Sequence, residues 1–335
     1  MLKIGLIGAG RIGKVHAETI AHSIADAQLV AVADYYKGAV HTLTQDYNIP
    51  FATDNALEVI EHPDVDAILI ASSTDTHAPF IIEAARAGKD IFCEKPIAAD
   101  LSKIDEALAI VDNAGVKLQI GFNRRFDASF QRIKQAIDDG SIGDPQLLHI
   151  ISRDPSPPPI EYVKVSGGLF FDMTIHDFDM ARFLFGDVEE IYATGANLVD
   201  PAIGDAGDID TALLTLKFTS GALGSIDNSR QAVYGYDQRV EAFGSKGSAA
   251  NTNLYPDEVT ISSGTRVERA SLPLNFFLER YMPSYRGELE AFTAAVLHDE
   301  PIPVTGQDGR FPVVMAMAAQ RSLKENRPVR LSEIE

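Results

Sequence analysis

Cysteine is nearly absent from this sequence, since Cys93 is the only one in 335 residues. An intramolecular disulfide is therefore excluded, and a reducing compartment such as the cytoplasm is expected. No apolar run approaches the ~20 residues of a membrane-spanning helix. The apolar segment near the N-terminus reaches Gly8 and then Arg11 too soon for a signal peptide. We therefore expect a soluble cytoplasmic protein in which Cys93 is a buried small hydrophobe.

Positive charge is also scarce, with 29 Lys and Arg against 48 Asp and Glu and a net charge of −19. Nucleic acids and anionic membranes bind basic surfaces, so neither is expected as a partner. A nucleotide remains open as a ligand, because backbone amides can bind its phosphates on an acidic protein. The chain is longer than one hydrophobic core usually reaches, which favours two domains.

The first third of the chain alternates short apolar runs with amphipathic segments. Continuous apolar strands separated by helices indicate a parallel sheet covered on both faces. We therefore predict an α/β Rossmann domain over residues 1–122 that binds NAD. Its expected strands are 3–10, 27–34, 65–72, 90–93 and 117–122.

A glycine motif links the first expected strand to the first helix: Gly8-Ala9-Gly10-Arg11-Ile12-Gly13. In this position the three glycines allow a tight turn, close approach of a pyrophosphate and close packing of the helix. Asp34 ends the second expected strand, where a carboxylate can bind both hydroxyls of an adenosine ribose. A 2′-phosphate would meet this negative charge, so NAD is favoured over NADP. The alternative is a glycine turn without a ligand.

Two further loops follow parallel strands at the edge where ligands bind in such sheets. The first contains Ser72, Ser73, Thr74 and His77, and the second contains Glu94 and Lys95. We include all six in the predicted cofactor site, with Lys95 near the nicotinamide end. The alternatives are ordinary helix capping in the first loop and a solvated lysine in the second.

The pattern changes after residue 122, and residues 123–335 are predicted to form a substrate-binding and oligomerisation domain. Strand-like runs joined by glycine-containing turns between about 188 and 270 indicate a large open antiparallel sheet. Helices are expected at 127–139, 167–186, 284–298 and 308–324. The result is an α+β domain with helices on one face of the sheet and an outer face through which subunits associate.

The expected helix at 167–186 has an apolar stripe and a polar face with Asp172, His176 and Asp179 at positions i, i+4 and i+7. A carboxylate beside an imidazole suits acid–base chemistry. It also suits a metal site or a structural hydrogen-bonded pair. Since no further His or Cys cluster supplies the remaining ligands, no metal is predicted. Asp179 has the alternatives of capping or pairing with Arg182.

Several motifs together resemble the glucose–fructose oxidoreductase/inositol dehydrogenase (Gfo/Idh/MocA) family, and within it the bacterial inositol 2-dehydrogenases. The resemblance rests on GLIGAGRIGKVHAE, Asp34, EKP, GFNRRFD, SRDP and GGLFFDMTIHDFDMARFL, and it extends over essentially the whole chain. It implies a Rossmann domain followed by an open-faced sheet domain, assembled as a homotetramer. It also implies NAD-linked oxidation of myo-inositol to scyllo-inosose, a step of inositol catabolism. The family's catalytic lysine, acid and histidine fall on Lys95, Asp172 and His176.

These roles agree with elementary chemistry. Oxidation of a secondary alcohol removes the hydroxyl proton while a hydride leaves for the nicotinamide. His176 suits the general base, Asp172 can orient it or bind a neighbouring hydroxyl, and Lys95 can stabilise charge on the reacting oxygen. The polyol ring needs further polar contacts, for which the candidates are Arg124, Arg125, Arg153, Asp154, Tyr234, Tyr236 and Tyr281.

The sequence alone leaves two other functions open. The same catalytic trio would serve a dehydrogenase for scyllo-inositol or for an aldose such as glucose. A non-catalytic NAD-sensing regulator would keep the glycine motif and Asp34 but would not need Lys95, Asp172 and His176 together.

Overall fold

The computed structural model describes residues 1–269 and 271–334. The chain divides into two compact units, each discontinuous in sequence. Unit 1 comprises residues 1–126 and 283–313, and unit 2 comprises residues 127–282 and 314–335. The first boundary lies close to the predicted one at 122/123. The return of 283–313 to unit 1 was not anticipated, because no sequence pattern shows which unit a late helix joins.

Unit 1 is built on a six-stranded parallel sheet in the order β3-β2-β1-β4-β5-β6. This is the doubly wound order of dinucleotide-binding folds, and it confirms the predicted Rossmann domain. The strands are β1 (Leu2–Ile7), β2 (Ala27–Ala33), β3 (Phe51–Thr53), β4 (Ala67–Ile70), β5 (Asp90–Glu94) and β6 (Leu118–Gly121). The three-residue strand β3 was not predicted, because so short a run has no detectable periodicity.

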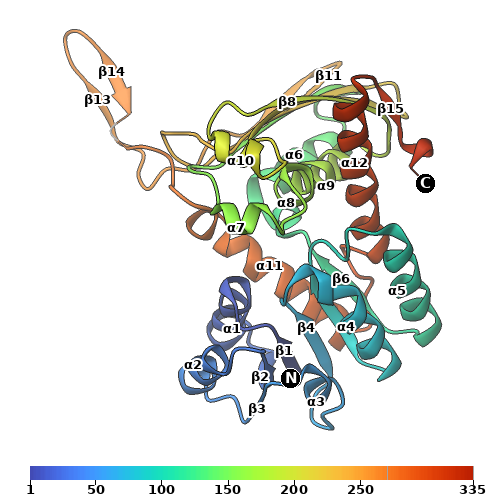
Figure 1. Cartoon of the computed structure of the whole chain (residues 1–335). Coiled ribbons are helices and arrows are strands. Elements are labelled where there is room, and N and C mark those ends of the chain that lie inside the picture. The colour runs from blue at the N-terminus through green and yellow to red at the C-terminus, as the bar shows by residue number, and fades with distance from the viewer. Residues whose placement is uncertain (270, 335) are drawn as a thin grey trace. The chain divides into compact units, whose positions relative to one another are not determined.

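Helices cover both faces of this sheet, with α1 and α2 on one side and α4 and α5 on the other (Figure 1). A helix from late in the sequence, α11, supplies Leu289 and Phe292 to the apolar core of this unit. Two shorter segments, α3 and the 3-10 turn η1, complete the unit. The bounds are α1 (Arg11–Ser23), α2 (Lys37–Tyr47), α3 (Ala56–Ile60), α4 (Thr74–Arg86), α5 (Leu101–Ala114), η1 (Asn123–Phe126) and α11 (Phe277–Leu297).

Unit 2 contains a seven-stranded sheet in the order β12-β11-β7-β10-β9-β8-β15. It is antiparallel except that β7 lies between β10 and β11 and runs parallel to β10. The predicted antiparallel sheet is thus confirmed, except that one pair of neighbouring strands, β7 and β10, is parallel. Its strands are β7 (Pro145–Arg153), β8 (Val188–Ala196), β9 (Thr211–Phe218), β10 (Leu223–Ser229), β11 (Asp237–Gly244), β12 (Gly247–Ala250) and β15 (Val329–Arg330).

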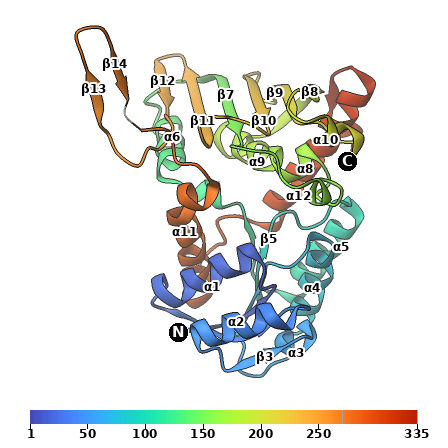
Figure 2. The same cartoon turned by 60° about the vertical axis from the view of Figure 1, so that its left-hand side comes forward.

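Helices lie on one face of this sheet, as predicted (Figure 2). Asn228 on β10 fixes the orientation: its amide donates to Asp177, and its oxygen accepts from Thr174, both on α9. A hairpin of β13 and β14 projects from the sheet region of the same unit. The bounds are α6 (Ala128–Asp138), α7 (Ile160–Val163), α8 (Leu169–Asp172), α9 (Thr174–Phe185), α10 (Pro201–Asp205), β13 (Thr260–Ser262), β14 (Val267–Arg269), α12 (Gly306–Glu325) and η2 (Leu331–Glu333).

Candidate active site

The glycine motif forms the turn from β1 into α1. Gly8 has a φ of +102°, and a Cβ there would lie 2.5 Å from the carbonyl carbon of Ala71. A Cβ at Gly13 would lie 2.0 Å from the Gly8 oxygen, so the helix packs directly on the turn. Nothing lies within 4 Å of a Cβ at Gly10. The turn therefore leaves open space at the middle glycine, at the N-terminus of α1, as a pyrophosphate requires.

Asp34 lies beside this turn, immediately after β2. Its carboxylate accepts hydrogen bonds from the backbone N–H of Ala9 at 2.6 Å and of Tyr36 at 2.8 Å. Exposed Lys37 pairs with Asp54 at 2.9 Å. A carboxylate held at the edge of the glycine turn fits the binding of ribose hydroxyls. Of the other motif residues, Arg11 is exposed and Ile12 is half-buried at the start of α1.

The four predicted cofactor residues in the loop after β4 differ in their exposure. Ser73 and Thr74 are exposed, and the Ser72 hydroxyl shares a hydrogen bond with Thr76 at 2.6 Å. His77 is buried instead, with Nδ1 2.7 Å from the Pro96 oxygen and Nε2 3.1 Å from the Ser72 oxygen. His77 therefore joins the loops that follow β4 and β5.

Lys95 follows the last residue of β5, Glu94, and is half-buried. Glu94 is directed inward, with Oε1 2.7 Å from His16 Nε2. Cys93 is fully buried, as predicted, and burial raises the pKa of its thiol well above the usual value. This thiol is therefore no nucleophile at neutral pH.

The expected continuous helix at 167–186 is interrupted in the structure. It consists of α8, which ends at Asp172, and α9, which begins at Thr174, with Met173 between them at φ −100° and ψ −58°. The apolar stripe is buried as predicted at Phe171, Ile175, Phe178 and Phe185. Asp172 and His176 are both half-buried, on either side of the break.

Asp172 is held through both carboxylate oxygens. The Tyr162 hydroxyl donates to Oδ1 at 2.8 Å, and Arg230 Nη1 donates to Oδ2 at 2.8 Å. The same Arg230 nitrogen lies 3.5 Å from Asp154 Oδ2. Burial lowers the pKa of Arg230, but the charges of Asp172 and Asp154 outweigh it and the net shift is upward. The structure thus brings Asp172 and Asp154 together around a buried guanidinium.

Sequence reasoning missed Tyr162 and Arg230. Arg230 had a detectable signal, because inward-facing residues alternate along β10 from Ile226 through Asn228, and the next position is Arg230. Tyr162 had none, since it lies in the short helix α7 after a proline-rich loop.

Arg153 and Tyr234 belong to a different cluster. Arg153 Nε donates to Asp227 at 3.0 Å and Nη1 donates to the Tyr234 hydroxyl at 3.2 Å, while Tyr234 donates to Asp237. Burial and the bond to Asp237 raise the pKa of Tyr234. Along β7 and β10, Arg153 and Asp227 alternate with the buried residues that face α9. These two side chains therefore lie on the opposite face of the sheet.

The remaining substrate candidates are buried. Tyr236 and Tyr281 pack edge to face, with ring centroids 5.9 Å apart. Arg124 and Arg125 lie in η1, and Arg125 pairs with Asp308 at 3.1 Å.

Metal binding by Asp172, His176 and Asp179 gains no support. Across residues 1–269 and 271–334, the group of His, Cys and acidic side chains close enough to share an ion is His16, Glu94 and Glu288. Asp179 is buried on α9, and Arg182 pairs with Asp187 at 2.9 Å.

Two known family domains match the chain, one in each unit. Residues 2–122 match the oxidoreductase family with the NAD-binding Rossmann fold, and residues 130–250 match the GFO/IDH/MocA C-terminal domain. The chain belongs to the GFO/IDH/MocA family. It is therefore an oxidoreductase, and the glycine turn and Asp34 belong to an NAD-binding domain.

Similar proteins span the whole chain. Myo-inositol 2-dehydrogenase of Thermotoga maritima is 48% identical, with 99% of each chain covered, and inositol 2-dehydrogenase of Rhizobium meliloti is 47% identical, with the same coverage. Scyllo-inositol dehydrogenase of Lactobacillus casei, solved with NAD(H) and scyllo-inositol, is 30% identical, with a TM-score of 0.93 and 99% of each chain covered. Among the described residues, no helix combines the length and apolarity needed to cross a bilayer.

Proposed function

We propose that this protein oxidises one ring hydroxyl of myo-inositol with NAD as the hydride acceptor, giving scyllo-inosose. The full-length similarity to a myo-inositol 2-dehydrogenase and an inositol 2-dehydrogenase supports the substrate class. Bound NAD supplies an electrophilic nicotinamide ring that takes the hydride from carbon.

Three side chains carry the chemistry in this proposal. His176 takes the proton from the reacting hydroxyl as general base. Asp172 binds an adjacent hydroxyl or orients the imidazole, and Lys95 donates a hydrogen bond to the reacting oxygen as negative charge develops there. The glycine turn holds the pyrophosphate at Gly10, and Asp34 holds the adenosine ribose.

The observation that carries the proposal is the fixed carboxylate of Asp172, four residues before His176. Hydrogen bonds from Tyr162 and Arg230 to its two oxygens define its position. Arg230 also has Nε and Nη2 buried without a partner among the described residues. Two carboxylates held side by side by one guanidinium suit a ring that presents several neighbouring hydroxyls.

The direct test is to supply NAD with myo-inositol, scyllo-inositol, chiro-inositol or glucose and to follow the absorbance of reduced nicotinamide. We expect the highest kcat/KM for myo-inositol.

His176→Ala should lower kcat by about 10²–10⁴-fold with NAD affinity retained. His298→Ala, at an exposed histidine after α11, is the matched control. Near-normal turnover in His176→Ala would refute the general-base role.

Scyllo-inositol is the second candidate substrate, because the Lactobacillus casei relative is solved with it. The same three residues would act on either isomer, and the choice depends on which hydroxyls are bonded. A higher kcat/KM for scyllo-inositol in the same panel would select it.

We further propose that copies of this chain assemble as a tetramer, in the cytoplasm, through the sheet face opposite α9. Leu147 pairs across strands with both Leu223 and Phe243 on that face, and these side chains are 38%, 52% and 42% exposed. A row of exposed large apolar side chains suits an interface. Light scattering after size-exclusion chromatography tests this, and a monomer at micromolar concentration would contradict it.

A further inference from the structure

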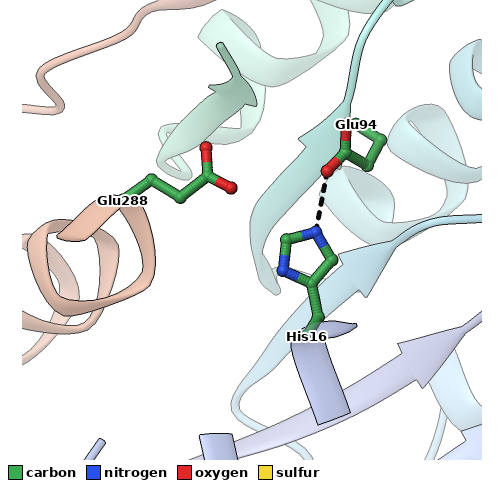
Figure 3. A group of neighbouring side chains, drawn as sticks. All are labelled: His16, Glu94 and Glu288. Carbon is green, nitrogen blue, oxygen red and sulfur yellow. Dashed lines mark hydrogen bonds and ion pairs between the residues drawn. The ribbon is translucent and has the colours of Figure 1, made fainter. Parts of the chain in front are cut away.

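Three ionisable side chains meet in the interior of unit 1, and the proposed reaction uses none of them directly. They are His16 on α1, Glu94 at the end of β5 and Glu288 on α11, and Figure 3 shows their polar groups facing one another. The residues are 0%, 9% and 0% exposed, and one potential ligand atom from each lies within 4.8 Å of the other two. So many ionisable groups in an apolar interior require charge compensation.

The three are unequally bonded. His16 Nε2 and Glu94 Oε1 are 2.7 Å apart, which accounts for one side of the imidazole. His16 Nδ1 and both carboxyl oxygens of Glu288 are buried without a partner among the described residues. An ionised carboxylate is strongly disfavoured in such a position, so Glu288 needs either a bound cation or its own proton.

The distance between His16 and Glu94 argues against a cation bound by both of these side chains. Two ligands bound tetrahedrally to one zinc ion, at about 2.0–2.2 Å each, lie more than about 3 Å apart. A separation of 2.7 Å is instead that of a hydrogen bond. Burial, and then the charge of Glu94, raise the pKa of Glu288 well above its usual value. A neutral Glu288 carries no charge and so needs no counter-ion in this interior.

The cluster adjoins Lys95. Glu94 immediately precedes this lysine, and the oxygen of Pro96, which immediately follows it, is 2.7 Å from His77 Nδ1. A Cβ at Gly121 on β6 would lie 3.0 Å from the Glu94 carboxyl carbon, so the neighbouring strand also limits where Glu94 can lie. Both chain neighbours of Lys95 are thus held by buried imidazoles.

We propose that Glu288 is a positioning residue: as a neutral acid it lies against the His16–Glu94 pair and keeps Glu94, and through it Lys95, in place. An ionised Glu288 would repel Glu94 across less than 5 Å of apolar interior. The neutral acid leaves Glu94 as the single carboxylate bonded to His16. This inference rests on the proposed function, in which Lys95 acts on the substrate.

Two variants of Glu288 separate positioning from bulk stability. Glu288→Gln keeps the size and the neutral polar group and should retain near-normal kcat. Glu288→Ala removes the group and should lower kcat by about 10–100-fold, the effect of misplacing a reacting group by roughly 1 Å, with the KM for NAD changed far less. Glu290→Gln, at an exposed position of α11 paired with Arg286, is the control. Equal loss of kcat in the Gln and Ala variants would overturn the inference.

A second measurement does not depend on inositol oxidation. The infrared difference spectrum of the wild type minus Glu288→Gln at pH 7 should contain the carbonyl stretch of a protonated carboxylic acid. A carboxylate band in its place would overturn the inference. So would one equivalent of zinc or manganese in the wild type that the Gln variant lacks. If no polyol is oxidised, the proposed function fails, while the infrared band still decides the state of Glu288.

Discussion

Glu288→Gln should stabilise the folded protein by an amount that grows with pH. In the unfolded chain Glu288 loses its proton above about pH 4.3, whereas burial in the folded protein raises its pKa well above the usual value. The folded state therefore holds one more proton than the unfolded state between these two pKa values. In that window the wild type loses about 1.4 kcal/mol of stability for each pH unit of increase. Glutamine does not titrate and escapes this loss.

Within that window, the free energy of unfolding of Glu288→Gln relative to wild type should rise by about 1.4 kcal/mol for each pH unit. Urea denaturation at three pH values in this interval measures the slope. Glu290→Gln serves as control, since Glu290 is exposed and bonded to Arg286 at 2.7 Å. A stability difference that stays constant with pH would show that Glu288 titrates alike in both states and would refute the reasoning.

Two other substitutions test further features of the structure. Asp34→Ala should narrow the preference for NAD over NADP in kcat/KM, because the repulsion of a 2′-phosphate is removed; an unchanged ratio would mean that the carboxylate does not reach the ribose. Asn228→Ala should destabilise unit 2 by about 2 kcal/mol or more, because it removes buried hydrogen bonds to Asp177 and Thr174 at 2.8 and 2.6 Å. Thermal unfolding measures this loss, and an unchanged midpoint would contradict the bridge from β10 to α9.

Five of the six strands of the parallel sheet in unit 1 were predictable because each is a short, mostly apolar run between helical segments. The run before Gly8 is continuously apolar, and the glycines specify a turn that only this residue fits, as the short distances from a Cβ at Gly8 and Gly13 confirm. Local sequence therefore determined both the strand and its ligand loop.

The contacts around Asp172 were less predictable because they join distant segments. Arg230 reaches Asp172 across 58 positions, and nothing near either residue encodes the pairing. The break at Met173 was also invisible, since Met and Thr fit a helix interior and the glycines lie at the ends of the segment. Likewise, adjacent Arg153 and Asp154 gave no sign that the sheet directs them to opposite faces.

The discontinuity of unit 1 has a consequence for the synthesis of the chain. Strands β1 to β6 leave the ribosome within the first 121 residues, yet Leu289 and Phe292 are part of their apolar core. Segment 283–313 is made only after most of unit 2. Domains generally fold as units during synthesis. In the nascent chain, part of the apolar surface of the Rossmann sheet therefore stays uncovered until segment 283–313 has been made. The half of the protein that is translated first is therefore the half that depends on a nearly finished chain.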